Sequence, residues 1–119
     1  MQHVRTLVVD DNISFLETVS LYLEKNGYQV TKASSIPDAL LELKKKSFEF
    51  VITDLRVGQR SGAEIMDYLS AHKEKTALIA MTAFIDDSNL ARICNFARVI
   101  LVKPFPLQDL SDALSQPQY

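Results

Sequence analysis

The stretch LVVDDN, residues Leu7 to Asn12, joins an apolar run directly to two adjacent carboxylates. Apolar side chains gain free energy by leaving water, whereas carboxylates resist burial. The run therefore predicts a buried strand over Val4–Val9. It also predicts that Asp10 and Asp11 lie at the mouth of the sheet, where water and a cation can reach them.

The composition is that of one ordinary globular domain spanning residues 1–119. Of the 119 residues, 47% are apolar and 24% are charged, so the chain is long enough to bury a core. The net charge is −2 and no segment concentrates basic residues, which argues against direct binding to nucleic acid. Residues 116–119 are predicted to be a linker stub, because Pro117 stops the last helix.

Cysteine usage and hydropathy indicate a cytoplasmic protein. The single cysteine, Cys94, cannot form a disulfide within the chain, which fits a reducing compartment. We expect its side chain to be a buried or half-buried apolar filler. No basic and apolar leader opens the chain, and no apolar run is long enough to span a membrane.

Short β-branched runs alternate with longer amphipathic segments along the chain. Strands are predicted over Val4–Val9, Tyr28–Ala33, Phe48–Thr53, Ala77–Met81 and Val99–Val102. Helices are predicted over about residues 14–25, after the capping Ser35, over about 62–71, from a polar stretch at about 86–88, and over about 107–114. Strands with two apolar faces belong to a parallel sheet covered by helices on both sides. The pattern predicts an α/β fold, a doubly wound (βα)5 three-layer sandwich.

Polar side chains stand where four of these strands end. Asp10 and Asp11 follow the first strand, Asp54 follows the third, Thr82 the fourth and Lys103 the fifth. Parallel strands bring their carboxyl ends to one edge of the sheet, and open α/β sheets bind ligands at that edge. We therefore expect these side chains to converge.

The chemistry of this set favours phosphoryl transfer. Close carboxylates repel each other unless they protonate or a cation neutralises them, and an all-oxygen donor set favours Mg²⁺ or Mn²⁺ over zinc. Lys103 is a point charge suited to a phosphate oxygen, and Thr82 offers a hydroxyl donor to the same group. Asp54 stands alone on the middle strand and is interpreted as the nucleophile, with the pair Asp10 and Asp11 as metal ligands.

Each of these residues also has a plainer interpretation. An aspartate after a strand often caps the next helix or forms a turn, and taken singly each acid fits that role better than metal binding. A lone threonine or lysine is still less informative. The functional interpretation rests on the joint pattern, because capping alone does not explain complementary chemistry at four strand ends.

Several short motifs, in this order and spacing, resemble the receiver domain of the response regulators of two-component signalling. They are VVDDN, VITDL, a glycine eight residues after Asp54 (Gly62), AMTA and LVKPF, and they cover nearly the whole chain. The resemblance implies a flavodoxin-like sheet with strand order 2-1-3-4-5. It also implies a signalling domain rather than an enzyme, with no chemistry beyond its own Mg²⁺-dependent phosphorylation and dephosphorylation.

The resemblance further implies roles for the acidic residues. Asp54 would accept a phosphoryl group from the phosphohistidine of a histidine kinase or a phosphotransfer protein. Asp11, Asp54 and the backbone carbonyl of Arg56 would bind Mg²⁺ directly, and Asp10 would act through water. The same resemblance makes Thr82 a hydrogen-bond donor to the phosphoryl group.

Lys103 would pair with the phosphoryl group, and the Lys103–Pro104 peptide is expected to be cis. In the family, phosphorylation shifts the surface of the fourth helix, fifth strand and fifth helix. That surface then binds a downstream protein, an output domain, or a second copy in a phosphorylation-dependent homodimer. The switch residues here would be Thr82, Phe84 and Ile100, with Ile100 in place of the usual aromatic side chain.

Gly58 is a second departure from the family pattern. The loop after Asp54 usually carries proline at this position, and glycine gives the loop more backbone freedom.

Other functions fit these residues less well. The main alternative is a phosphorylation-independent protein-interaction module on the same fold, although such modules usually lack one of the five site residues. A Mg²⁺ phosphatase with an aspartyl nucleophile needs a second acid two residues later, where this chain has Arg56, and a cap for which 119 residues leave no room. A flavin site needs small hydroxyl or glycine residues after the first strand, where this chain has Asp10 and Asp11.

Overall fold

The computed structural model describes residues 4–72, 75–83 and 88–115. Within them, five parallel strands form one sheet of order β2-β1-β3-β6-β7. The strands are β1 (Val4–Val9), β2 (Tyr28–Ala33), β3 (Phe50–Asp54), β6 (Ala77–Thr82) and β7 (Val99–Val102). The expected order 2-1-3-4-5 is therefore confirmed, since β6 and β7 are the fourth and fifth strands of this sheet.

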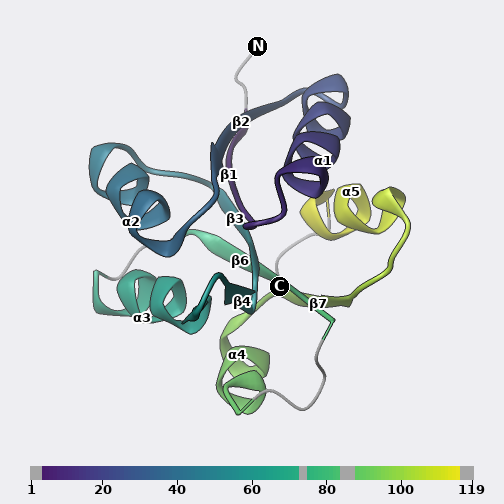
Figure 1. Ribbon diagram of the computed structural model, residues 1–119. Helices are drawn as coiled ribbons and strands as arrows, with labels where there is room; N and C mark the ends of the chain where they lie inside the picture. The colour runs from purple at the N-terminus through teal and green to yellow at the C-terminus, as the bar shows by residue number, and fades with distance from the viewer. Residues whose placement is uncertain (1–3, 73–74, 84–87, 116–119) are drawn as a thin grey trace.

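Helices cover both faces of the sheet, as Figure 1 shows. α1 (Ile13–Lys25) and α5 (Leu107–Ser115) pack on one face. α2 (Ile36–Lys45), α3 (Ala63–Ala71) and α4 (Leu90–Phe96) pack on the other. The result is the three-layer sandwich that the alternating sequence pattern predicts.

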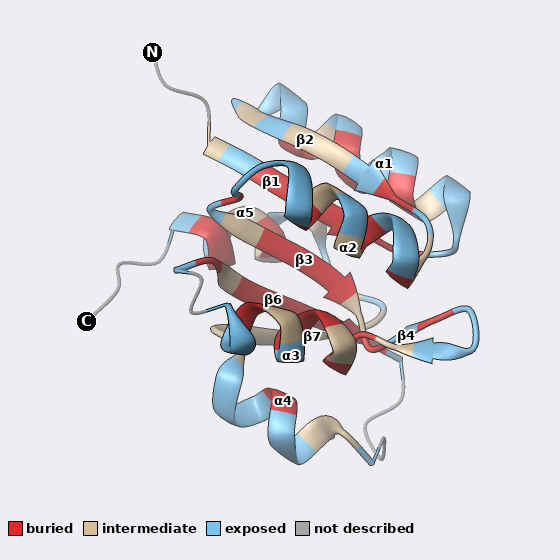
Figure 2. Cartoon of the chain, turned by 90° about the vertical axis from the view of Figure 1, so that its left-hand side faces the viewer, coloured by how far each residue is buried: buried red, intermediate tan, exposed pale blue. Residues whose placement is uncertain are grey.

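Successive side chains of a central strand enter opposite cores. Leu7 and Val9 of β1 pack with α2 and α3, whereas Val8 between them packs with α1 and α5. This alternation explains why the run is apolar at every position, because a strand covered on both faces has no side for polar residues. Figure 2 shows the resulting buried band along β1, β3 and β6.

Helix ends follow local capping chemistry. Asn12 caps α1 by accepting a hydrogen bond from the backbone N–H of Phe15, and Ser35 caps α2 in the same way from Asp38. Gly27 follows α1 with φ at +92°, a conformation that favours glycine at the C-terminal end of a helix. These local contacts set where α1 and α2 begin and where α1 ends.

Three local expectations are corrected by the structure. β3 begins at Phe50 rather than Phe48, because the carbonyl of Phe48 accepts a hydrogen bond from the hydroxyl of Thr76. The side chain of Phe48 is nevertheless buried, which explains its apolar signal. Cys94 is exposed rather than buried, since α4 turns its neighbour Ile93 toward the core instead.

The third correction concerns the loop after Asp54, which forms a small antiparallel hairpin instead. It consists of β4 (Arg56–Val57) and β5 (Arg60–Ser61). Gly58 is the first of its two turn residues, with φ at +65°, as two-residue hairpin turns require. Proline cannot adopt this φ, so glycine at this position permits the turn.

Two further predictions from the sequence concern a linker stub at the end of the chain and the lack of a membrane-spanning segment. The proposed linker stub, residues 116–119, lies outside the described residues. In the part of the chain that is described, no helix combines the length and apolar character that crossing a membrane requires.

Candidate functional site

The strand ends bring the sequence-predicted residues to one edge of the sheet. Asp54 is the last residue of β3 and pairs in register with Met81 of β6. Thr82 ends β6 and pairs with Val102, the last residue of β7, so Lys103 follows at the same level. The backbone N–H of Lys103 also donates to the carbonyl of Thr82.

Lys103 joins two of the carboxylates directly. Its Nζ donates to Asp10 Oδ2 at 2.8 Å and to Asp54 Oδ2 at 2.7 Å. The side chain of Lys103 is 21% exposed and that of Asp54 14% exposed, so this group is screened only partly by water. Residues from the ends of three strands, far apart in sequence, therefore form one hydrogen-bonded cluster.

Asp10 is buried, which corrects the expectation that both acids face water. Its side chain is only 1% exposed. The carboxylate is tolerated there because Lys103 pairs with Oδ2 and the backbone N–H of Asn12 donates to Oδ1 at 2.9 Å. Both oxygens of Asp10 are thus hydrogen-bonded, as a buried charge requires.

The carboxylates determine the protonation of Lys103. Burial by itself disfavours the ammonium and would lower its pKa, but the hydrogen bonds to Asp10 and Asp54 outweigh that effect. The pKa of Lys103 therefore lies above its ordinary value. The lysine is a fixed cation at neutral pH, suited to attract an anionic group to this edge.

Asp54 is held by its own loop as well as by Lys103. The backbone N–H of Arg56 donates to Asp54 Oδ1 at 3.2 Å. The backbone beneath it is held by Gly62, whose N–H donates to the carbonyl of Leu55 at 2.8 Å. Hydrogen bonds on both of its oxygens therefore orient the Asp54 carboxylate at the carboxyl end of β3.

Asp11 is exposed and contacts the hairpin that follows Asp54. Its Oδ2 accepts a hydrogen bond from the backbone N–H of Gly58 at 3.0 Å. Proline at position 58 would have no N–H to donate. The glycine that departs from the family pattern therefore links the tip of the hairpin to the acidic cluster.

The sequence-predicted switch residues are only partly placed. Thr82 is buried at the end of β6, next to the level of Asp54. Ile100 of β7 is half-buried and packs against the core that contains α2, α3 and α4. Phe84 lies outside the described residues. The Lys103–Pro104 peptide is cis, as the resemblance implies.

The comparison with protein families agrees with this geometry. The model of the response regulator receiver domain matches residues 6–115 of the chain. The chain belongs to the response regulator receiver domain family. Receiver domains are signalling domains of two-component response regulators, and phosphate acceptance is consistent with the family.

Curated relatives of this receiver domain are longer proteins. The acid tolerance regulatory protein ActR of Sinorhizobium medicae is 27% identical over 114 residues, which cover 92% of this chain and 57% of ActR. The transcriptional regulatory protein ZraR of Klebsiella oxytoca is 28% identical over 116 residues, which cover 97% of this chain and 26% of ZraR. The chain thus spans about half of the first relative and about a quarter of the second.

Solved structures share the fold over nearly the whole chain. A receiver domain protein from Clostridium thermocellum is 30% identical with a TM-score of 0.84, over 93% of this chain and 90% of that one. A response regulator from Burkholderia pseudomallei is 27% identical with a TM-score of 0.85, over 95% of this chain and 67% of that one. The latter structure has a phosphorylated aspartic acid, a calcium ion and citrate.

Receiver domains generally bind Mg²⁺, and the donor set here fits a hard divalent cation. The carboxylates of Asp10, Asp11 and Asp54 outnumber the ammonium of Lys103 at this edge. Across residues 4–72, 75–83 and 88–115, no group of three or more His, Cys, Asp or Glu side chains is arranged to hold a metal. Mg²⁺ usually takes one or two carboxylates and keeps several waters, so two acids suffice in number.

The sequence interpretation missed the aromatic neighbour of Lys103. The Nζ of Lys103 lies 4.3 Å from the centroid of the Phe15 ring, and the Phe105 ring meets Phe15 edge-on at 6.2 Å. The sequence could have indicated this neighbour, because Phe15 is in the first turn of the helix that follows Asp11 and so begins close to the acidic residues. It also missed the hairpin, which a Gly-X pair between two short extended segments can indicate.

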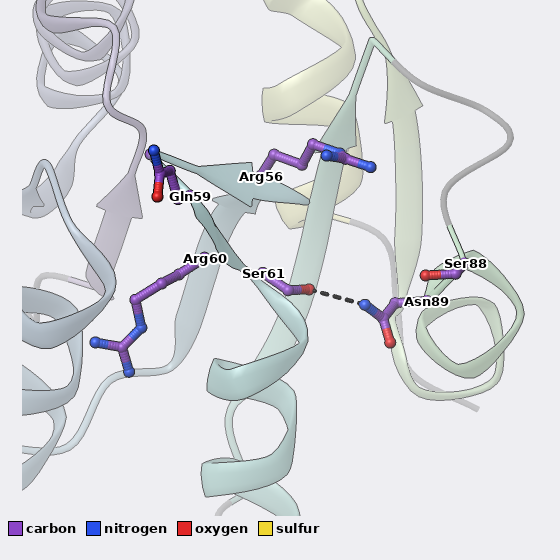
Figure 3. A pocket seen from close by; sticks show the side chains of 7 residues that line it. Arg56, Gln59, Arg60, Ser61, Ser88 and Asn89 are labelled. Carbon is purple, nitrogen blue, oxygen red and sulfur yellow. Dashed lines mark hydrogen bonds between the residues drawn. The ribbon is translucent and has the colours of Figure 1, made fainter.

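A polar cleft of about 170 Å³ lies beside the cluster, between the hairpin and the start of α4. Figure 3 shows its lining, in which Asn89 donates to the hydroxyl of Ser61 at 3.2 Å and so joins α4 to β5. The side chains of Arg56 and Arg60 point in different directions, and Arg60 pairs with Glu64 of α3. Arg56, one of the sequence-predicted site residues, lines this cleft.

Proposed function

We propose that this receiver domain accepts a phosphoryl group on Asp54 from the phosphohistidine of a histidine kinase or a phosphotransfer protein. The observation that carries the proposal is the pairing of Lys103 with Asp54 and the buried Asp10 at the carboxyl edge of the sheet. A capping aspartate has no need of such an ammonium. The similar structure from Burkholderia pseudomallei has a phosphorylated aspartic acid, which supports phosphate acceptance by an aspartate on this fold.

In the proposed reaction a carboxylate oxygen of Asp54 attacks phosphorus and forms an O–P bond. The N–P bond of the phosphohistidine breaks, and its electron pair stays on the departing imidazole. The backbone N–H of Arg56 and the Nζ of Lys103 orient the carboxylate beforehand. Lys103 then remains beside the transferred group, where its charge offsets the phosphoryl oxygens.

Mg²⁺ would be held by Asp11, Asp54 and the backbone carbonyl of Arg56, with Asp10 acting through water. When bound, the cation would neutralise charge on the transferred phosphoryl group. Mn²⁺ suits the same oxygen donors. The role of this chain's own residues is to place two carboxylates and one ammonium around the acceptor oxygen.

The proposed output is a change of the surface formed by α4, β7 and α5. The phosphoryl group adds charge and acceptor oxygens next to Thr82, and Thr82 is joined through its backbone to Lys103 at the end of β7. Ile100 would transmit the change by packing rather than by rotation of a ring. The surface would control a downstream protein, an output domain or a phosphorylation-dependent homodimer, in the cytoplasm.

The test is uptake of phosphate from a small acyl phosphate. The purified chain is incubated with acetyl phosphate and Mg²⁺, and intact mass spectrometry measures the addition of one phosphoryl group. Wild type is expected to gain it, Asp54→Asn is not, and a chelator is expected to suppress the reaction. Asp67→Asn is the matched control, since Asp67 is an exposed acid on α3 that pairs with Arg92.

Two outcomes would overturn the proposal. The first is a wild-type protein that stays unmodified although Mg²⁺ binding is confirmed by calorimetry. The second is modification that persists in Asp54→Asn. Binding of a partner that is identical in wild type and Asp54→Asn, together with no phosphate uptake, would favour the phosphorylation-independent interaction module.

A further inference from the structure

The ammonium of Lys103 has an aromatic face as its third neighbour. Two of its directions are taken by the carboxylates of Asp10 and Asp54. The Nζ also lies over the ring of Phe15, 4.3 Å from its centroid. An aromatic face attracts a cation through the negative potential above the ring, and the attraction grows when water is excluded.

The position of the Phe15 ring is fixed from two sides. Its backbone N–H donates to the side chain of Asn12 at 3.0 Å, which sets the start of α1. Its ring meets Phe105 edge-on, with centroids 6.2 Å apart and planes at 89°. Edge-on contacts of this kind are favourable for aromatic pairs. Phe15 is therefore anchored at its backbone by Asn12 and packed at its ring by Phe105 where it meets Lys103.

We propose that Phe15, supported by Phe105, is a positioning residue that holds the Lys103 ammonium in place for phosphoryl transfer to Asp54. A lysine side chain has four carbons and high rotamer entropy, so two hydrogen bonds alone leave it able to swing toward solvent. The Phe15 ring blocks this movement of the Lys103 ammonium. When a phosphoryl group reaches Asp54, the ammonium is already beside the oxygens whose charge it must offset. This inference rests on the proposed function of Asp54 and Lys103.

A purely structural role for Phe15 is the competing explanation, because the ring also packs against the core formed by α1 and α5. Replacing hydrogens of the ring with fluorine separates the two. Fluorination keeps the approximate shape and packing of phenylalanine but weakens its attraction for a cation. A structural role predicts no dependence of phosphorylation on fluorination.

The first experiment measures the rate of phosphorylation by acetyl phosphate in Mg²⁺. Incorporation of mono-, tri- and pentafluorophenylalanine at position 15 is expected to lower the rate stepwise, by about three- to tenfold at the end of the series. Phe15→Leu is expected to show a similar loss, and Phe15→Tyr to retain the rate. The urea midpoint is expected to stay nearly constant across the fluorinated series.

Phe50 provides a matched control. Its ring lies 5.5 Å from the guanidinium carbon of Arg98, so it makes a comparable cation contact, but it belongs to the opposite end of β3 from Asp54. Fluorination at Phe50 is expected to leave the phosphorylation rate unchanged. A rate that is flat across the Phe15 series, or that falls equally in the Phe50 series, overturns the inference.

The second experiment needs no phosphate and therefore separates this inference from the proposed function. Proton NMR of the Lys103 ε-methylene group is expected to show an upfield ring-current shift in wild type that disappears in Phe15→Leu. Unchanged Lys103 resonances in Phe15→Leu overturn the contact itself. A wild-type chain that shows the ring-current shift but takes up no phosphate overturns the proposed function instead.

Discussion

Substituting Gly62 with alanine is a direct test of how the backbone beneath Asp54 is packed. Gly62 is buried, and a Cβ built on it would lie 2.3 Å from the carbonyl oxygen of Asp54 and 3.3 Å from the hydroxyl of Thr53. The first distance is much shorter than an ordinary van der Waals contact. The oxygen that the Cβ would meet belongs to the backbone, so it cannot rotate away as a side chain could. Either Asp54 or the start of α3 must therefore move in Gly62→Ala.

Backbone preference alone would make Gly62→Ala more stable than wild type, not less stable. Gly62 has φ −60° and ψ −15°, which alanine adopts freely, so a smaller loss of chain entropy would stabilise the variant by about 0.4–1 kcal/mol. Forcing an extra methyl group into a packed site costs about 1–3 kcal/mol. The clash outweighs the entropy gain, and we expect Gly62→Ala to lower the free energy of unfolding by about 1–2 kcal/mol.

Urea unfolding followed by circular dichroism measures this change. With a slope of about 1–3 kcal/mol per molar urea for a small domain, the midpoint is expected to fall by roughly 0.3–2 M. The phosphorylation rate with acetyl phosphate is expected to fall as well, because the shifted backbone carries the Asp54 carboxylate. The two measurements together link packing to the site.

Gly27→Ala is the matched control for the change of glycine to alanine. Gly27 has no atom within 4 Å of a built Cβ, but its φ of +92° strains any other residue. That strain costs about 1–2 kcal/mol at a site remote from Asp54, so stability is expected to fall while phosphorylation is retained. A Gly62→Ala protein as stable and as readily phosphorylated as wild type would refute the reasoning.

The remaining predictions concern Lys103 and Cys94. Because the folded pKa of Lys103 is raised, its stabilising effect is complete below the unfolded pKa of about 10.4 and is lost as pH rises through the folded pKa. Urea midpoints of wild type are thus expected to fall more steeply above about pH 10.4 than those of Lys103→Met, and parallel curves would contradict this. Cys94 is exposed, so a thiol reagent is expected to label the folded chain, and Cys94→Ser to change stability by less than about 0.5 kcal/mol. Labelling only after unfolding would show the side chain to be buried.

Much of the fold could be read from short-range pattern. The strands Val4–Val9, Tyr28–Ala33 and Val99–Val102 lie where their apolar runs predict, and Ser35 caps α2 as expected. These features depend on neighbours within a few residues, which a sequence shows directly. The start of β3 was misplaced because burial of Phe48 does not require a place in the strand ladder, and Thr76, 28 residues away, binds its carbonyl.

The expected meeting of Asp10, Asp54 and Lys103 also came from a rule about topology, that parallel strands end at one edge. The rule gives proximity but not the local environment. It placed Asp10 in water, whereas the structure buries it, because burial depends on the ammonium that arrives from the end of β7. The exposure of Cys94 was missed for a similar reason, since α4 buries Ile93 and leaves the next residue, Cys94, facing solvent.

By itself, then, the sequence determined the order of strands and helices, the (βα)5 pattern and the set of polar residues at the strand ends. Hydrophobic period and capping are local, so they are legible without coordinates. Only the tertiary structure decided which atoms meet: Lys103 between two carboxylates, Phe15 against its ammonium, Gly58 on Asp11, and Gly62 beneath Asp54. These contacts join residues brought together by the packing of separate elements, and their energies depend on distances and burial that no local pattern encodes.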